Sequence, residues 1–241
     1  MKVIILCAGL GSRTGLDYPK SLFKFNDQER LIEKNIKTIK KMGIKNKDII
    51  FATGFKHNMI KNYTYKKFNY IKNNSYLSTN MVYTLLNTLN KIQNQDVIVI
   101  YADIIFDLNC LKPIFKSKFK ITTLVDKEWL KKWRLKKNFK EDLEELVIKK
   151  NKIIKIGKKT RKINGIDGRY VGITKFNKDM IQLLKNKKFL KKVVKNYKKI
   201  DFTNLFMRLI DTNIDINIAH KKLNWFEFDN KEDFMIYENN F

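Results

Sequence analysis

The sequence of 241 residues is 44% hydrophobic, which is enough to bury the core of one globular domain. Its formal net charge of +27 raises nucleic acid and anionic membranes as partners. The lysines, however, occur as doublets along the whole chain, together with Asn, Ile, Phe and Tyr, whose codons are all rich in A and T. We attribute the charge to codon bias and expect solvated surface lysines, with no specific nucleic acid and no membrane as partner.

The two cysteines, Cys7 and Cys110, lack the spacing of a metal site or a disulfide framework. Cys7 lies in an apolar run and is interpreted as a small core residue. The apolar stretch Val3–Leu6 is too short for a signal peptide or a membrane span. We expect a single domain over residues 1–241 in a reducing cytoplasm, and the sequence leaves monomer and homodimer open.

The first half of the chain alternates predicted strands with predicted helices. Strands are predicted at Lys2–Cys7, Asp48–Thr53, Asp96–Tyr101 and Ile121–Val125, and helices at Leu31–Met42 and Asn80–Leu89. Gly43 is expected to stop the first helix, and Thr79 or Ser78 to cap the second. This alternation predicts βαβ units, and therefore an α/β fold in which a mostly parallel central sheet is covered on both faces, a Rossmann-like three-layer sandwich.

The second half is less regular. A hairpin is predicted over Leu146–Ile156, further strands at Tyr170–Phe176 and Ile214–Ala219, and helices at Phe202–Ile210 and Lys231–Tyr237.

The most informative segment follows the first strand and reads AGLGSR at 8–13, then YPKS at 18–21. A glycine loop after a strand lets backbone N–H groups approach phosphate oxygens, because no Cβ stands in the way. Arg13 can offer a planar fork to a pyrophosphate, and Lys20 adds a point charge beside the rigid Pro19. No Gly-Lys-Ser/Thr follows, so this is not a P-loop, and Thr14 at the third glycine position makes a poor dinucleotide fingerprint.

This combination resembles the A-G-x-G-x-R and P-K signature of the nucleotidyltransferases, which include sugar-1-phosphate nucleotidylyltransferases and the phosphocholine, aminoethylphosphonate and phosphoglutamine cytidylyltransferases. The resemblance implies that Arg13 and Lys20 hold the triphosphate as the catalytic cations. The stretch from Ser78 to Met81 is similar to the family's T-N-M beside the nucleotide, although ordinary helix capping is equally compatible. The implied nucleotide-binding residues are Ala8, Gly9, Gly11, Ser12, Arg13, Lys20, Thr79 and Asn80.

Two carboxylates are candidate Mg²⁺ ligands. Asp103 follows a predicted strand, so it lies at the carboxyl edge of the sheet, where ligands bind in open α/β folds. A carboxylate there suits a hard cation, although an Asp also commonly caps a helix. The segment WFEFD at 225–229 resembles the family's W-x-E-x-D, which implies that Asp229 is the second ligand, with Glu227 as the alternative.

The segment DKEW at 126–129, with Trp133-Arg134 and the later Asp142-Leu143-Glu144, resembles the acceptor side of the phosphocholine and phosphonate branch. A zwitterionic acceptor needs aromatic faces and a carboxylate for its amine, and Lys or Arg for its phosphate. Core packing is the alternative role for each tryptophan. The implied acceptor residues, within an insertion at roughly 126–176, are Lys127, Trp129, Trp133, Arg134, Glu144 and Tyr170.

The resemblance covers almost the whole chain and implies a cytidylyltransferase that moves CMP from CTP to a small phosphate- or phosphonate-bearing acceptor. A sugar-1-phosphate nucleotidylyltransferase is the second interpretation, against which the tryptophan-rich segment 129–134 speaks. An inactive or nucleic-acid-binding relative is the third. Retention of Arg13, Lys20 and both Asp residues speaks against it.

Overall fold

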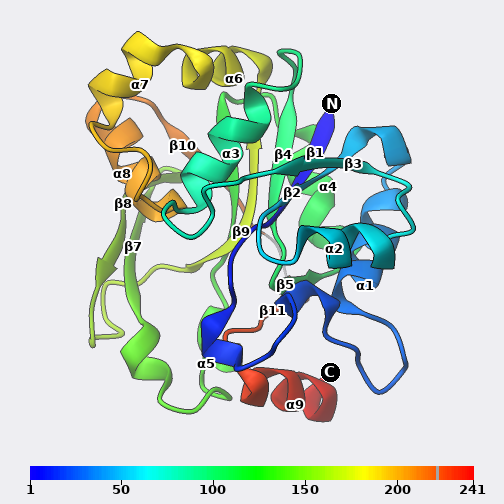
Figure 1. The fold of residues 1–241 in the computed structure, drawn as a ribbon. Helices are drawn as coiled ribbons and strands as arrows, with labels where there is room; N and C mark the ends of the chain where they lie inside the picture. The colour runs from blue at the N-terminus through cyan, green and yellow to red at the C-terminus, as the bar shows by residue number, and fades with distance from the viewer. Residues whose placement is uncertain (221–222) are drawn as a thin grey trace.

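The computed structural model describes residues 1–220 and 223–241 (Figure 1). Its central sheet has nine strands in the order β3-β2-β1-β4-β9-β6-β10-β8-β7. These strands are β1 (Lys2–Cys7), β2 (Ile49–Thr53), β3 (Asn69–Lys72), β4 (Val97–Tyr101), β6 (Ile121–Asp126), β7 (Glu144–Lys149), β8 (Lys152–Lys159), β9 (Arg169–Phe176) and β10 (Ile216–Ala219). A separate antiparallel pair joins β5 (Ile104–Phe106) to β11 (Trp225–Glu227).

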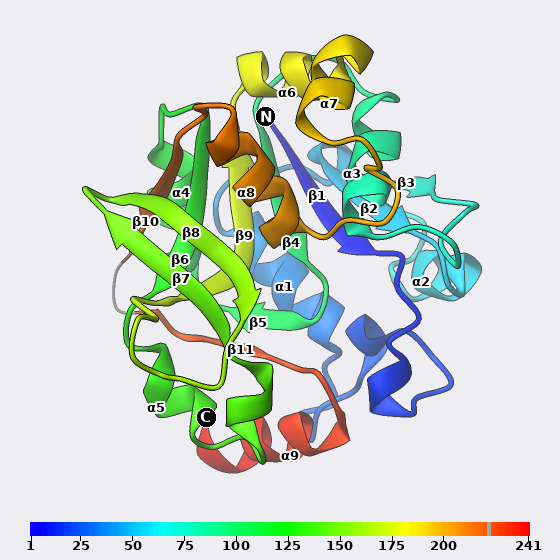
Figure 2. The ribbon, with the colours of Figure 1, turned by 90° about the vertical axis from the view of Figure 1, so that its left-hand side faces the viewer.

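The central sheet is mostly parallel. Strands β3, β2, β1 and β4 pair in parallel, as do β6 and β10. Strand β9 lies antiparallel between β4 and β6, and β8 lies antiparallel between β10 and β7. The hairpin of β7 and β8 therefore forms one end of the sheet, where Figure 2 shows it projecting beside α5.

Helices cover both faces of this sheet and make the predicted three-layer sandwich. They are α1 (Leu31–Lys40), α2 (His57–Tyr63), α3 (Met81–Leu89), α4 (Leu108–Lys116), α5 (Trp129–Trp133), α6 (Lys178–Lys185), α7 (Lys187–Val193), α8 (Phe202–Asp211) and α9 (Lys231–Asn240). Side chains of β1 point alternately to the two faces, so Val3 and Ile5 pack with α1, α2 and α4, whereas Ile4 packs with α3, α6 and α8. The α/β fold class read from the sequence is confirmed.

The local predictions hold where a run of apolar residues is long. Gly43 adopts a left-handed φ of 78° and its N–H donates to Lys40 O, which stops α1 as expected. The N-cap of α3 differs from the prediction. Asn80, and neither Ser78 nor Thr79, is the N-cap, because its side chain accepts from Met81 N while the Thr79 hydroxyl donates to Ser75 O.

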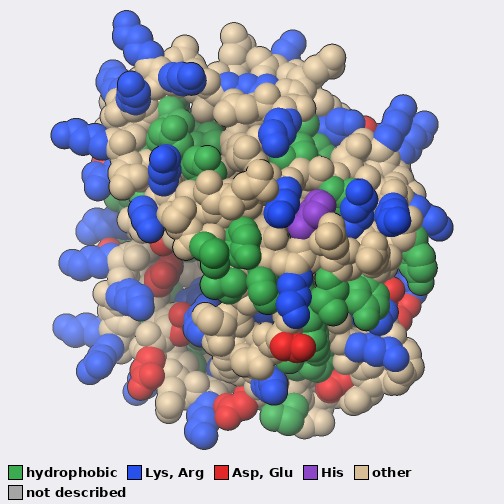
Figure 3. All heavy atoms as spheres, in the orientation of Figure 1, with side chains coloured by type: hydrophobic (Ala, Val, Ile, Leu, Met, Phe, Trp, Pro, Cys, Tyr) green, Lys and Arg blue, Asp and Glu red, His purple; other side chains and the backbone are tan. Residues whose placement is uncertain are grey.

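The surface agrees with dispersed lysines on the face that Figure 3 shows, where Lys and Arg side chains are spread over the whole view and acidic side chains border a hollow on its left. Cys7 is buried, and burial raises the pKa of its thiol, as fits the small core residue that was predicted. In the described part of the chain, no helix is both long enough and apolar enough to cross a membrane.

Candidate active site

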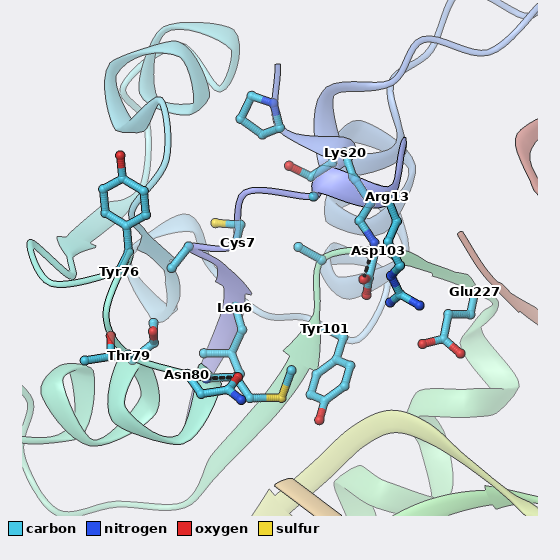
Figure 4. Close-up of a pocket in the computed structure, with 18 residues that line it drawn as sticks. Leu6, Cys7, Arg13, Lys20, Tyr76, Thr79, Asn80, Tyr101, Asp103 and Glu227 are labelled. Atoms are coloured by element: carbon cyan, nitrogen blue, oxygen red, sulfur yellow. Dashed lines mark hydrogen bonds and ion pairs between the residues drawn. The ribbon is translucent and has the colours of Figure 1, made fainter. Parts of the chain in front are cut away.

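The glycine loop and Asp103 meet because their strands run in the same direction. The loop follows β1 and Asp103 follows β4, and these two strands are parallel neighbours. Together with the start of α3 they enclose a cavity of about 250 Å³, the nucleotide cavity, shown in Figure 4. Of the predicted nucleotide residues, those that line it are Ala8, Gly9, Gly11, Arg13, Lys20, Thr79 and Asn80.

Gly11 and Lys20 fit together. Gly11 has a φ of 64°, and a Cβ placed on it would lie 2.9 Å from Lys20 Cγ, so the lysine side chain runs directly over the glycine. Lys20 Nζ then reaches Asp103 Oδ2 at 3.0 Å and the Phe228 carbonyl oxygen at 3.1 Å. The ammonium group is thereby held at the floor of the nucleotide cavity, where Figure 4 shows it beside Asp103.

The wall opposite Lys20 is made by the segment between β3 and α3. Asn73 is buried, and its side-chain amide donates to the hydroxyls of Thr79 and Thr84. Asn80 is fixed through its backbone N–H, which donates to Lys198 O at 2.7 Å. Ser12 starts a short 3₁₀ helix and does not line the nucleotide cavity. It is the one predicted nucleotide-binding residue that the described structure does not place there.

Asp229 lies beside the loop as well, although it is distant in the sequence. The pairing of β5 with β11 and the hydrogen bond from Phe228 N to Asp103 O bring the segment 227–229 next to Asp103. Arg13 Nη2 contacts Asp229 Oδ1 at 2.7 Å, and Lys136 Nζ contacts Asp229 Oδ2 at 3.1 Å. Burial would raise the pKa of Asp229, but Lys136, Arg13 and Lys20 hold it below its ordinary value, so the carboxylate stays charged.

Glu227 faces both Asp103 and Asp229. Burial and the charge of Asp229 raise the pKa of Glu227 well above its usual range, against the opposing effect of Arg169 and Lys136. Asp103 and Asp229 supply carboxylate oxygens from two segments that are hydrogen-bonded to each other, whereas the raised pKa of Glu227 makes it a poorer ligand for a cation. Among the described residues no three His, Cys, Asp or Glu side chains form a metal cage on their own. This set fits Mg²⁺, which typically takes one or two carboxylates and completes its octahedron with water and substrate phosphates.

A second cavity of about 320 Å³, the acceptor-side cavity, shares a wall with the first. The residues that line both cavities are Arg13, Asn80, Met81, Tyr101 and Glu227. Six of the chain's 24 acidic residues line the acceptor-side cavity, namely Asp142, Glu144, Glu145, Asp201, Glu227 and Asp229. Asp142, Glu227 and Asp229 are paired with arginines or a lysine of the chain. Glu144 and Asp201 form no ion pair among the described residues, and these two acids could contact a cationic group.

Arg169 is the counter-charge of this cavity. Its guanidinium donates to Asp142 O at 2.6 Å and to Asp142 Oδ2 at 2.7 Å, and it lies 3.6 Å from Glu227. The Trp133 ring packs against it, 4.2 Å from ring centre to guanidinium carbon. Burial would lower the pKa of Arg169, but Glu227, Asp142 and Glu144 raise it, so the positive charge is fixed.

The structure divides the predicted acceptor residues. Glu144 and Tyr170 line the acceptor-side cavity, whereas Lys127 and Arg134 are exposed elsewhere. Trp129 and Trp133 are fully buried and line neither cavity, which corrects the expectation that both contact an acceptor. The two rings pack against each other in the core, because α5 turns its apolar side inward.

Sequence reasoning missed Arg169, Asp201 and Lys136, and it quoted Asp142 only as part of the segment 142–144. One signal was available for the first of these: the chain has six arginines among 51 basic residues, and two of the six, Arg13 and Arg169, line the acceptor-side cavity. In a composition so rich in lysine, an arginine is a candidate for a position that uses the planar fork, although Arg134 and Arg161 are exposed and line neither cavity. The acids and Lys136 carry no such signal, since their partners lie far away in the sequence.

Residues 3–116 match the model of the MobA-like NTP transferase domain. The chain is 28% identical to the CTP:phosphoglutamine cytidylyltransferase of Campylobacter jejuni, over 95% of this chain and 96% of that protein. The inositol-1-phosphate CTP transferase from T. maritima superposes with a TM-score of 0.76 at 17% identity, covering 98% of this chain and 94% of that one. The CTP:phosphocholine cytidylyltransferase from Streptococcus pneumoniae superposes with a TM-score of 0.70 at 22% identity, covering 99% of this chain and 97% of that one.

The two solved structures establish the fold, and the family model and the curated relative both indicate a nucleotidyltransferase. The glycine loop, Arg13 and Lys20 all fall inside the matched region, and they line the nucleotide cavity. Residues 3–116 therefore resemble a MobA-like NTP transferase domain, and the chain as a whole is similar to a cytidylyltransferase.

Proposed function

We propose that the protein is a Mg²⁺-dependent cytidylyltransferase that transfers CMP from CTP to a small acceptor bearing a phosphate or phosphonate at one end and a primary amine at the other. The observation that carries this proposal is the pair of adjoining cavities. One is lined by the glycine loop and two cations, and the other by six acidic residues. Their shared wall, with Arg13 and Glu227, is where the two substrates would meet.

In this reaction an oxygen of the acceptor phosphate attacks the α-phosphorus of CTP, and a new phosphorus–oxygen bond forms. The bond from the α-phosphorus to the bridging oxygen breaks, and pyrophosphate leaves with the electron pair. The attacking oxygen is anionic near neutral pH, so no general base is needed. Arg13 and Lys20 stabilise the charge on the departing pyrophosphate. Mg²⁺ held by Asp103 and Asp229 would supply further neutralisation of the triphosphate charge.

The lining of the acceptor-side cavity favours a primary amine over a quaternary one. A primary ammonium donates hydrogen bonds to carboxylates, whereas a quaternary ammonium has no N–H and prefers aromatic faces. Trp129 and Trp133 are buried and do not line the cavity, whose aromatic side chains are Tyr101 and Tyr170. Carboxylates such as Glu144 and Asp201 lie in the same lining. Aminoethylphosphonate and phosphoglutamine therefore fit better than phosphocholine. The relative from Campylobacter jejuni is named for phosphoglutamine.

A sugar 1-phosphate is the second candidate acceptor. The burial of Trp129 and Trp133 favours it, because it removes the feature that set the chain apart from the sugar-nucleotide enzymes. The acidic lining speaks against it, since a neutral sugar offers no cation to Glu144 and Asp201, which form no ion pair among the described residues.

A crossed screen of pyrophosphate release tests the proposal. CTP, UTP, dTTP, ATP and GTP are each combined with aminoethylphosphonate, phosphoglutamine, phosphocholine and glucose 1-phosphate, with Mg²⁺ or with a chelator. The proposal expects release with CTP and an amine-bearing acceptor, and loss of release with the chelator. Faster release with glucose 1-phosphate than with every amine would establish the second candidate instead.

A further inference from the structure

Lys136 is a buried lysine that the proposed reaction does not use. It follows α5, and its side chain is 7% exposed. Its Nζ lies 3.1 Å from Asp229 Oδ2 and 3.2 Å from Asp233 Oδ2. A buried cation between two carboxylates is costly unless the geometry is good, because all three charges lose hydration. The position of Lys136 therefore calls for a role beyond stability.

The two oxygens of Asp229 have different partners. Oδ1 contacts Arg13, whose side chain is 67% exposed and can exchange partners at little cost. Oδ2 contacts Lys136, which is buried among the described residues. Arrival of a triphosphate would draw Arg13 away from Oδ1, whereas nothing comparable competes for Lys136. The partner of Oδ1 can therefore change when substrate binds, whereas the partner of Oδ2 stays in place.

The surroundings of Lys136 keep it in place. The ring of Trp133 lies 4.5 Å from its Nζ, and that of Phe226 lies 5.3 Å away. Asp233, its second partner, also accepts the backbone N–H groups of Asp229 and Asn230 at the start of α9. Backbone and side chain of Asp229 are therefore tied to the same pair of charges, and Trp133 has a role as the wall behind them.

We propose that Lys136 is a positioning residue that holds Asp229 Oδ2, so that Oδ1 is the oxygen presented to the metal when Arg13 turns to the triphosphate. This inference rests on the proposed function, in which Asp229 is a metal ligand. It assigns to Lys136 no contact with either substrate. Partners that orient a metal ligand in this way typically contribute about 10- to 100-fold to metal affinity.

Metal binding, measured apart from turnover, tests the inference. Mn²⁺ is titrated, by its paramagnetic resonance signal, into the full chain saturated with a non-hydrolysable CTP analogue. Lys136→Met is expected to weaken Mn²⁺ binding about 10- to 100-fold, and Lys136→Arg to recover part of the loss. Lys137→Met, at the exposed neighbouring lysine, serves as the matched control and keeps the original affinity. Binding of the CTP analogue without metal is expected to be the same in all four proteins.

Competition between Lys136 and the metal for the Asp229 carboxylate would give the result that contradicts the inference. If Lys136 merely competes with the metal for the carboxylate, Lys136→Met binds Mn²⁺ as tightly as the original protein or more tightly, and the positioning role is overturned. Asp229→Asn distinguishes failure of the positioning role from failure of the proposed function. If this variant keeps the original Mn²⁺ affinity, Asp229 is not a metal ligand and the metal assignment of the proposed function is wrong. If Lys136→Met does not fold, Asp233→Asn carries the same test, because its amide oxygen can still accept from Asp229 and Asn230 while the negative charge that holds Lys136 is lost.

Discussion

Removal of the Arg169 charge is the sharpest single perturbation of the acceptor-side cavity. In Arg169→Met, both hydrogen bonds to Asp142, the ion pair with Glu227 and the cation–π contact with the Trp133 ring are lost. Hydrogen bonds to charged groups contribute about 1.5–3 kcal/mol each, and a cation–π contact about 0.5–2 kcal/mol. Asp142 is 45% exposed and regains water, and Met keeps apolar contact with the ring, so the expected loss lies below the sum of these contributions, which is about 3.5–8 kcal/mol.

We expect a loss of about 2–3 kcal/mol in the free energy of unfolding, which lowers the Tm by about 4–12 °C for a chain of this size. Thermal unfolding followed by circular dichroism measures the shift. Arg161→Met, at an exposed arginine, is the matched control and should change the free energy by no more than about 0.5 kcal/mol. The KM for the acceptor is expected to rise while the KM for CTP is unchanged, because Arg169 lines only the acceptor-side cavity. Equal Tm values for the two variants would refute this reasoning.

Three further predictions concern the nucleotide side and one the core. Gly11→Ala is expected to lower turnover strongly, because its Cβ would collide with the Lys20 side chain at a left-handed φ; unchanged kinetics would show that the loop adapts. Arg13→Ala should lower kcat with little change in Tm, and Arg13→Lys should rescue it only in part, as the planar fork is lost; a full rescue would contradict this. Asp103→Ala should reduce kcat by orders of magnitude at saturating Mg²⁺ while the circular dichroism spectrum stays the same, and near-normal turnover would remove Asp103 from the mechanism. Trp133→Ala should cost about 3–5 kcal/mol of unfolding free energy in chemical denaturation, since the ring is buried; a small change would mean that the ring packs loosely.

The fold could be predicted because its main strands are buried runs of β-branched residues. Strands such as β1 and β4 are covered on both faces, so their sequences are continuous apolar stretches that no helix periodicity explains. Short elements escaped prediction. Strands β5 and β11 have three residues each, too few for a period, and α4 contains Pro113, which argues against a helix in sequence reasoning.

The nucleotide side of the site could be predicted because it is local. Residues 8–20 form one loop, and their spacing carries the signature of phosphate binding. The acceptor side is assembled from segments far apart: Arg169 meets Asp142 across 27 residues and Lys136 meets Asp229 across 93. The tryptophans misled for a physical reason, because an aromatic ring in a short helix serves a core and a binding site equally well, and only its burial distinguishes them.

Phosphorus NMR of the complete reaction tests the central claim most directly. The protein is mixed with CTP, Mg²⁺ and aminoethylphosphonate or phosphoglutamine, and the phosphorus signals of substrates and products are followed over time. We predict that the triphosphate and acceptor signals fall together while those of pyrophosphate and of a new cytidylyl anhydride rise in equal amounts. Unchanged CTP with every amine-bearing acceptor, together with a nucleotide product formed from a sugar 1-phosphate, would contradict the account.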